Sequence, residues 1–124
     1  MTKILVAEDE RDIRELINFT LRLRGYEVVL ARDGEEALEL ALKEHPDLVL
    51  LDIRMPRMSG YEVCQLIKDN EATKHIPVVF LTAKGQESEV QQGMKAGATD
   101  YILKPFSPDT LVERLQKHLE GEVQ

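Results

Sequence analysis

Five short apolar runs, rich in branched side chains, alternate along the chain with longer segments of helical periodicity. The runs lie at residues 3–7, 27–31, 47–51, 77–81 and 99–103, and each has the length of a strand rather than of a helix. Between them, apolar residues recur at spacings of three and four, as in Ile13, Ile17 and Leu21. Strands and helices that alternate in this way predict an α/β fold, in which a parallel sheet carries helices on both faces.

The composition of the five runs also indicates the order of the strands. The first, third and fourth runs are almost wholly apolar, which is typical of strands that are buried on both faces. The second run contains Glu27 and the fifth contains Thr99 and Asp100, so these two are predicted to be the edges. We therefore expect a doubly wound, five-stranded sheet in the flavodoxin-like order 2-1-3-4-5.

Length and composition limit the class of protein. A length of 124 residues fits one domain, which we place at residues 1–120, with a frayed tail at residues 121–124. Hydrophobic residues make up 43% of the chain, enough for a packed core. No apolar run approaches the roughly 20 residues of a membrane-spanning helix, so no membrane contact is expected. The single Cys64 excludes an internal disulfide and suits the reducing cytoplasm. The net charge of −7 argues against direct binding to nucleic acid.

Polar side chains follow four of the five apolar runs, at the point where each predicted strand ends. Glu8 and Asp9 follow the first run, Asp52 the third, Thr82 the fourth and Lys104 the fifth. Because the carboxyl ends of parallel strands meet at one edge of the sheet, these groups are expected to lie close together around the switch point between the first and third strands.

Three neighbouring carboxylates call for a cation. Two unit charges 4 Å apart repel by about 4 kcal/mol at an effective dielectric constant of 20. An all-oxygen site favours Mg²⁺, with Mn²⁺ as a possible substitute. A metal ion, the Lys104 ammonium and the Thr82 hydroxyl together suit a phosphoryl group, and Asp52 can act as the nucleophile that forms an acyl phosphate.

Several motifs in this order resemble the receiver domains of two-component response regulators. They are Glu8-Asp9, Leu-Leu-Asp-Ile-Arg-Met-Pro at 50–56, Ser59-Gly60, Leu-Thr-Ala at 81–83 and Gly-Ala-Thr-Asp-Tyr-Ile-Leu-Lys-Pro-Phe at 97–106. The resemblance covers essentially the whole chain. It implies a domain that catalyses only its own phosphotransfer and autodephosphorylation, and the chain would be either a complete single-domain regulator or an excised receiver domain.

The resemblance also implies a role for each site residue. Asp52 would accept the phosphoryl group from a sensor histidine kinase. The magnesium ligands would be Glu8 through water, Asp9 directly, Asp52 and the backbone carbonyl of Arg54. Thr82 and Lys104 would contact the phosphoryl oxygens. The bond between Lys104 and Pro105 would be cis.

A switch is a further implication of the resemblance. Phosphorylation would draw Thr82 inward, Tyr101 would follow, and the surface of the fourth helix, fifth strand and fifth helix would change for a downstream protein or effector domain. The resemblance also implies that Arg54 and Lys84 would border the path of the hydrolytic water, and we expect them to lengthen the lifetime of the phosphoryl group. The protein would be a monomer or a weak phosphorylation-dependent dimer, in which Asp100 and Arg114 could form charge pairs.

Other interpretations are less favoured. A flavin-binding protein would need a loop after the first strand that accepts phosphate, but that loop is acidic. An aspartyl phosphatase would need a second catalytic carboxylate two residues after Asp52, where Arg54 stands. A docking module that works without phosphate remains the alternative. His45, His75 and His118 are predicted to be solvated or capping residues, and Cys64 to be part of the core.

Overall fold

Five parallel strands form one sheet in the order β2-β1-β3-β4-β5, as the sequence predicts. The structure, a computed structural model, describes residues 1–83 and 87–120. The strands are β1 (Lys3–Ala7), β2 (Glu27–Ala31), β3 (Leu48–Asp52), β4 (Val78–Ala83) and β5 (Asp100–Lys104). The last three begin one residue later than predicted and reach further. Asp52, Thr82 and Lys104 therefore belong to strands, where paired neighbours fix their backbones.

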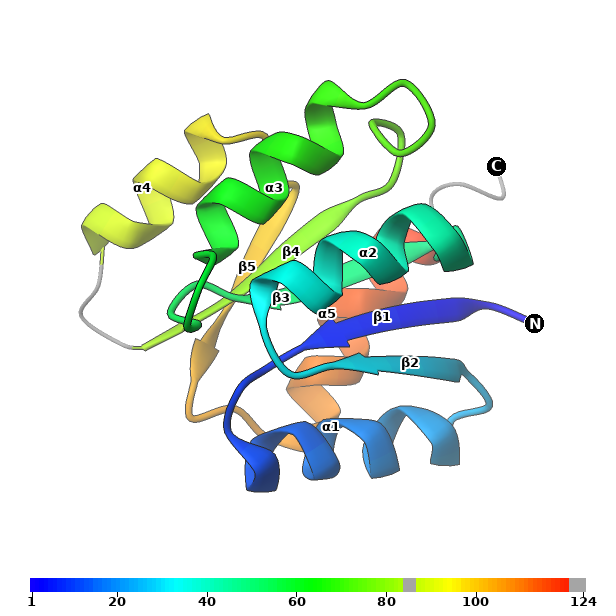
Figure 1. The fold of residues 1–124 in the computed structure, drawn as a ribbon. Coiled ribbons are helices and arrows are strands. Elements are labelled where there is room, and N and C mark those ends of the chain that lie inside the picture. Colours follow the sequence, from blue (N-terminus) through cyan, green and yellow to red (C-terminus); the bar gives the residue numbers. More distant parts are fainter. Residues whose placement is uncertain (84–86, 121–124) are drawn as a thin grey trace.

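Helices cover both faces of this sheet, as Figure 1 shows. The helices are α1 (Arg11–Leu23), α2 (Gly34–Glu44), α3 (Gly60–Asp69), α4 (Glu87–Lys95) and α5 (Pro108–Glu120). α1 and α5 pack on one face, whereas α2, α3 and α4 pack on the other. The predicted doubly wound, flavodoxin-like architecture is confirmed.

The two faces of the sheet have separate cores because side chains alternate along each strand. In β3, Val49 and Leu51 face the helices α2 and α3, while Leu48 and Leu50 face α1 and α5. All five residues of β3 are buried. Each fully buried aliphatic side chain contributes about 1.5–3 kcal/mol through the hydrophobic effect. The strand that ends at Asp52 is therefore the most firmly held.

Local signals at the helix ends behave as expected. The Asp33 side chain accepts a hydrogen bond from the third residue of α2 at 2.9 Å, and Ser107 Oγ accepts one within the first turn of α5 at 3.1 Å. Ser59 forms a capping box at the start of α3. Gly25 and Gly97 have φ angles of +89° and +106°, the left-handed conformation that ends a helix.

Residues outside the acidic edge are largely as predicted, with one correction. Cys64 is fully buried in the core, and His45 and His75 are exposed. His118 is not solvated: only 15% of its side chain is exposed, and Nε2 lies 2.9 Å from Asp100 Oδ2. Within residues 1–83 and 87–120, no helix has the length and apolar character needed to cross a bilayer. The predicted tail at residues 121–124 lies outside the described residues.

Candidate functional site

The carboxyl ends of the strands bring three acidic side chains together. Glu8 directly follows β1 and is fully buried, and Asp52, the last residue of β3, is 6% exposed. Together with Asp9, each offers one oxygen, and these three oxygens lie within 4.8 Å of one another. The sequence-based expectation that these acids converge at one edge is therefore confirmed.

Lys104 supplies the positive charge at this acidic cluster. From the end of β5, its Nζ lies 2.9 Å from Glu8 Oε1 and 3.4 Å from Asp52 Oδ2. Burial and the negative charge of Glu8 raise the pKa of Asp52 to about 8, although Lys104 opposes the shift. One lysine therefore does not balance the three acids, and the metal-free pocket favours the protonated form of Asp52 near neutral pH.

A buried oxygen without a hydrogen bond indicates whether a cation fits this cluster. Glu8 Oε1 is the one buried side-chain polar atom without a hydrogen bond in residues 1–83 and 87–120. The Lys104 ammonium is close enough to pair with it, but not at an angle that makes a hydrogen bond. A buried carboxylate oxygen with free lone pairs, next to two further carboxylates, is a suitable donor set for a divalent cation. The residues present therefore fit a metal ion.

The loop after β3 is held close to the sheet, which positions the Asp52 carboxylate. Ile53 N donates to Leu81 O at 3.2 Å, and Gly60 N donates to Ile53 O at 2.9 Å. A Cβ atom on Gly60 would lie only 2.5 Å from the carbonyl oxygen of Asp52, so any larger residue would push α3 away from the strand end. Arg54 N donates to Asp52 Oδ1 at 3.4 Å, a long contact that leaves this oxygen accessible.

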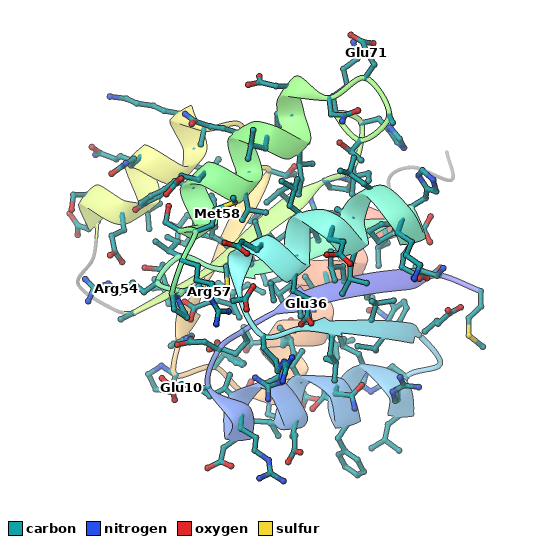
Figure 2. The ribbon with its side chains drawn as sticks, in the orientation of Figure 1. Glu10, Glu36, Arg54, Arg57, Met58 and Glu71 are labelled. Carbon is teal, nitrogen blue, oxygen red and sulfur yellow. The ribbon has the colours of Figure 1, made fainter. Side chains whose placement is uncertain are left out.

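An open hollow of about 230 Å³ lies over Asp52. Figure 2 shows Glu10 and Arg54 on the side of the molecule toward which the strand ends point. The residues that line the hollow are Asp9, Glu10, Asp52, Arg54, Thr82, Ala83, Glu89 and Lys104. A hollow that combines four acids, one hydroxyl and two cationic side chains has room for a small oxyanion beside a metal ion.

Three residues of the hollow, Glu10, Ala83 and Glu89, are absent from the sequence-based site, and of these Glu89 binds two of the predicted site residues. Glu89 lies in the first turn of α4, where Oε1 accepts a hydrogen bond from Thr82 Oγ1 at 2.9 Å. Its other oxygen, Oε2, accepts from Arg54 Nε at 2.8 Å. An acidic residue seven positions after a strand-end threonine was the available signal, but an acid in a first helical turn is common for electrostatic reasons alone.

The surface formed by β5 and α5 contains a partly buried charge cluster. Arg114 binds both oxygens of Asp100, at 2.7 and 3.1 Å, and His118 also contacts this carboxylate. The Arg114 guanidinium lies 5.8 Å from the ring centre of the half-buried Tyr101. Burial alone would raise the pKa of Asp100, but the hydrogen bonds from Arg114 and His118 lower it below its usual value.

Two other expectations have different outcomes. The bond between Lys104 and Pro105 is cis, as the resemblance implies. Lys84, the second residue expected to tune the phosphoryl lifetime, lies outside the described residues. The roles of Asp52, Thr82, Lys104 and Tyr101 stay predictions.

The fold and the site together define a flavodoxin-like α/β domain with an acidic, lysine-containing pocket at the switch point of its sheet. The sequence profile of the response regulator receiver domain matches residues 4–116. The chain therefore belongs to this family.

Individual relatives agree with the family assignment. The phosphate regulon transcriptional regulatory protein PhoB of Pseudomonas aeruginosa is 45% identical over 113 residues, which are 91% of this chain and 49% of the relative. The transcriptional regulatory protein ResD of Bacillus subtilis is 45% identical over 115 residues, 93% of this chain and 47% of that protein. This chain thus spans about half the length of these relatives. The chemotaxis protein CheY4 of Vibrio cholerae superposes with a TM-score of 0.91 at 38% identity, with 96% of this chain and 99% of that chain covered.

Proposed function

We propose that the chain is a phosphorylation-activated switch that accepts a phosphoryl group on Asp52 from a sensor histidine kinase. The observation that supports this most strongly is the position of Asp52. Its carboxylate ends the most buried strand, opens onto the hollow, and has Lys104 at 3.4 Å. A nucleophile needs this combination of a fixed backbone, an accessible oxygen and a nearby positive charge.

The transfer replaces one bond to phosphorus with another. An oxygen of Asp52 attacks the phosphorus atom of the kinase phosphohistidine, the new oxygen–phosphorus bond forms, and the nitrogen–phosphorus bond breaks. The electron pair of that bond stays on the imidazole. Lys104 and Thr82 then contact the phosphoryl oxygens, where an ammonium and a hydroxyl stabilise the developing charge. Hydrolysis ends the signal. Water attacks the same phosphorus atom, the bond between phosphorus and the Asp52 oxygen breaks, and Asp52 returns to a carboxylate with release of inorganic phosphate.

The acidic cluster would hold Mg²⁺, with Mn²⁺ as a substitute. Glu8 would act through water, Asp9 and Asp52 directly, and the carbonyl of Arg54 as a further ligand. A bound divalent ion supplies positive charge that offsets the carboxylates and the phosphoryl oxygens. Charge balance supports this assignment, because the pKa of Asp52 is raised to about 8 when Lys104 alone faces the acids.

Thr82 and Tyr101 are proposed to transmit the change to the surface. Thr82 lies on β4 and Tyr101 on β5, and these two strands pair directly. Tyr101 packs beside Arg114 on the surface formed by α4, β5 and α5. When Thr82 moves toward the phosphoryl group, Tyr101 can follow it inward. We propose that a downstream protein or an effector domain reads this surface.

The relatives suggest what that output is in longer proteins. PhoB and ResD are named as transcriptional regulators, and this chain matches about half of each. Residues 1–120 would form the receiver domain, which works in the cytoplasm, where the kinase obtains ATP. Direct contact with nucleic acid by these residues is not expected, because their acidic charge repels phosphates.

Oligomerisation is proposed to be weak and dependent on phosphorylation. Asp100 and Arg114, the residues expected to pair between copies, bind each other within one chain at 2.7 Å. A dimer that uses them must share or open this pair. Sedimentation with and without a phosphoryl mimic tests the proposal, and an unchanged mass would contradict it.

Arg54 and Lys84 are proposed to lengthen the lifetime of the aspartyl phosphate. Arg54 lines the hollow and is exposed enough to swing over a group on Asp52. The half-life of the phosphorylated protein should shorten in Arg54→Asn, in Lys84→Glu and most in the double variant. Unchanged half-lives in all three would rule the tuning role out.

The decisive experiment for the proposed function is chemical phosphorylation. The purified chain is incubated with Mg²⁺ and acetyl phosphate, and its intact mass is measured. One added phosphoryl group on the wild type and none on Asp52→Ala is the expected result. A wild type that stays unmodified, with Mg²⁺ present, would favour the docking module that works without phosphate.

A further inference from the structure

Glu89 connects the proposed phosphorylation site with helix α4. We propose that its carboxylate is an internal competitor of the phosphoryl group, and this inference rests on the proposed function. In the unphosphorylated protein, Glu89 holds the Thr82 hydroxyl and the Arg54 guanidinium, two donors that a phosphoryl group on Asp52 would take. Phosphorylation then releases Glu89, and with it the first turn of α4.

The geometry shows a carboxylate that uses one oxygen for each donor. Oε1 lies 2.9 Å from Thr82 Oγ1, and Oε2 lies 2.8 Å from Arg54 Nε. Thr82 is buried and the Glu89 side chain is 16% exposed, so water competes little for the bond between them, whereas the Arg54 side chain is 70% exposed and its bond is open to solvent. Hydrogen bonds to a charged acceptor in such surroundings are shorter and stronger than neutral ones.

The competition follows from the number of protons on each donor. The Thr82 hydroxyl has one proton, so it can donate to Glu89 or to a phosphoryl oxygen, but not to both at once. Arg54 has several N–H groups and can donate to both Glu89 and a phosphoryl oxygen. To do so, its side chain has to lie close to both anions. A phosphoryl group on Asp52 would lie in the 230 Å³ hollow that Glu89 lines, and the two negative charges would repel each other.

Helix α4 is held by few other contacts, so the release of Glu89 has consequences there. Gly93 is the buried residue of α4, and it lies against the Phe80 ring, where a Cβ would come within 2.6 Å of a ring atom. The Tyr61 hydroxyl donates to the backbone oxygen of Glu89 at 3.0 Å. Thr82 and Arg54 therefore provide much of the attachment of the first turn of α4 to the body of the domain.

The test compares Glu89→Gln with Glu87→Gln. Both substitutions remove one negative charge from the first turn of α4, but Glu87 is exposed and outside the hollow. The affinity for beryllofluoride, a phosphoryl mimic, is measured with Mg²⁺ present by titration followed in ¹⁵N NMR spectra. Glu89→Gln should bind it about fivefold more tightly than the wild type, since a neutral amide competes less well for Thr82. Glu87→Gln should match the wild type.

Hydrogen exchange gives a second readout that needs no phosphoryl mimic. Amides of α4 should exchange faster in Glu89→Gln than in Glu87→Gln, and the wild type should approach the rates of Glu89→Gln once beryllofluoride is bound. Equal beryllofluoride affinities in the two variants, or α4 exchange that Glu89→Gln does not change, would overturn the competition alone. A wild type that does not bind beryllofluoride at all would instead overturn the proposed function on which the inference rests.

Discussion

Replacement of Asp52 by asparagine should stabilise the metal-free domain. The buried acidic cluster raises the pKa of Asp52 from 3.8 to about 8, so the folded protein disfavours the carboxylate that the unfolded chain accepts freely. At pH 7 the unfolded chain ionises Asp52, whose unfolded pKa is 3.8, whereas the folded protein keeps it protonated. At about 1.4 kcal/mol for each pH unit between 3.8 and 7, this lowers the free energy of unfolding by about 4 kcal/mol. Asparagine carries no charge and avoids this penalty.

The sign of the pH dependence follows from the direction of the shift. Below the unfolded pKa of 3.8 both states are protonated and the penalty is absent. It grows as pH rises through the interval up to about 8 and is then constant. The stability advantage of Asp52→Asn should therefore fall from about 4 kcal/mol at pH 7 to about 2 kcal/mol at pH 5.

Urea unfolding followed by circular dichroism, in the presence of a chelator, measures this difference, since the chain has no tryptophan to report on unfolding. Asp69→Asn is the control, because Asp69 is exposed at the end of α3 and its charge should matter by less than about 1 kcal/mol. Mg²⁺ should then stabilise the wild type, by ~2.7 kcal/mol at a hundredfold excess over its dissociation constant, and stabilise Asp52→Asn less. Equal unfolding free energies of wild type and Asp52→Asn at pH 7 without metal, or a difference that does not shrink in acid, would refute the reasoning.

Three further outcomes are expected. Burial raises the pKa of Cys64 to about 11, so iodoacetamide at pH 8 should modify the folded chain far more slowly than the urea-unfolded chain, and comparable rates by mass spectrometry would contradict this. Gly93→Ala should lower the unfolding free energy by about 1–3 kcal/mol, because its Cβ would meet the Phe80 ring at 2.6 Å; an unchanged denaturation midpoint would show that the ring moves freely. The pKa of Asp100 is lowered, so its ion pair with Arg114 stabilises the fold above the unfolded pKa and is lost as pH falls through the folded pKa; Asp100→Asn should remove this part of the acid dependence of the unfolding free energy.

The arrangement of the sheet follows from sequence patterns that depend on backbone geometry. Apolar runs locate the strands, and the polar residues in Glu27–Ala31 and Asp100–Lys104 identify the edges. The starts of β3, β4 and β5 are off by one residue because ladder pairing, not composition, decides where a strand begins. Thr99 N, for example, still donates to Val78 O at 2.8 Å although Thr99 lies outside β5.

The candidate site also contains residues that the sequence predicts and residues that it does not. The convergence of Glu8, Asp52 and Lys104 was predictable, because the carboxyl ends of parallel strands all lie at the same edge of the sheet. Glu89 was not predictable, since its contacts depend on how α4 is rotated about its own axis. That rotation is set by the packing of Gly93 on Phe80, a fit that periodicity does not describe. His118 was placed wrongly for the same kind of reason: its ring reaches Asp100 only because α5 packs beside β5.

The division of the domain into a firmly packed part and a lightly packed part explains how a change at Asp52 could reach the surface at low cost. Helix α3 buries four of its residues, whereas α4 buries only Gly93. A shift of α3 would open cavities in the core, and each lost methylene would cost about 1 kcal/mol. A shift of α4 breaks mainly polar contacts, and the proposed phosphoryl group would replace the one at Thr82. The Thr82 hydroxyl of β4 is thus shared between the pocket and Glu89 of α4, the helix that can move without loss of the core.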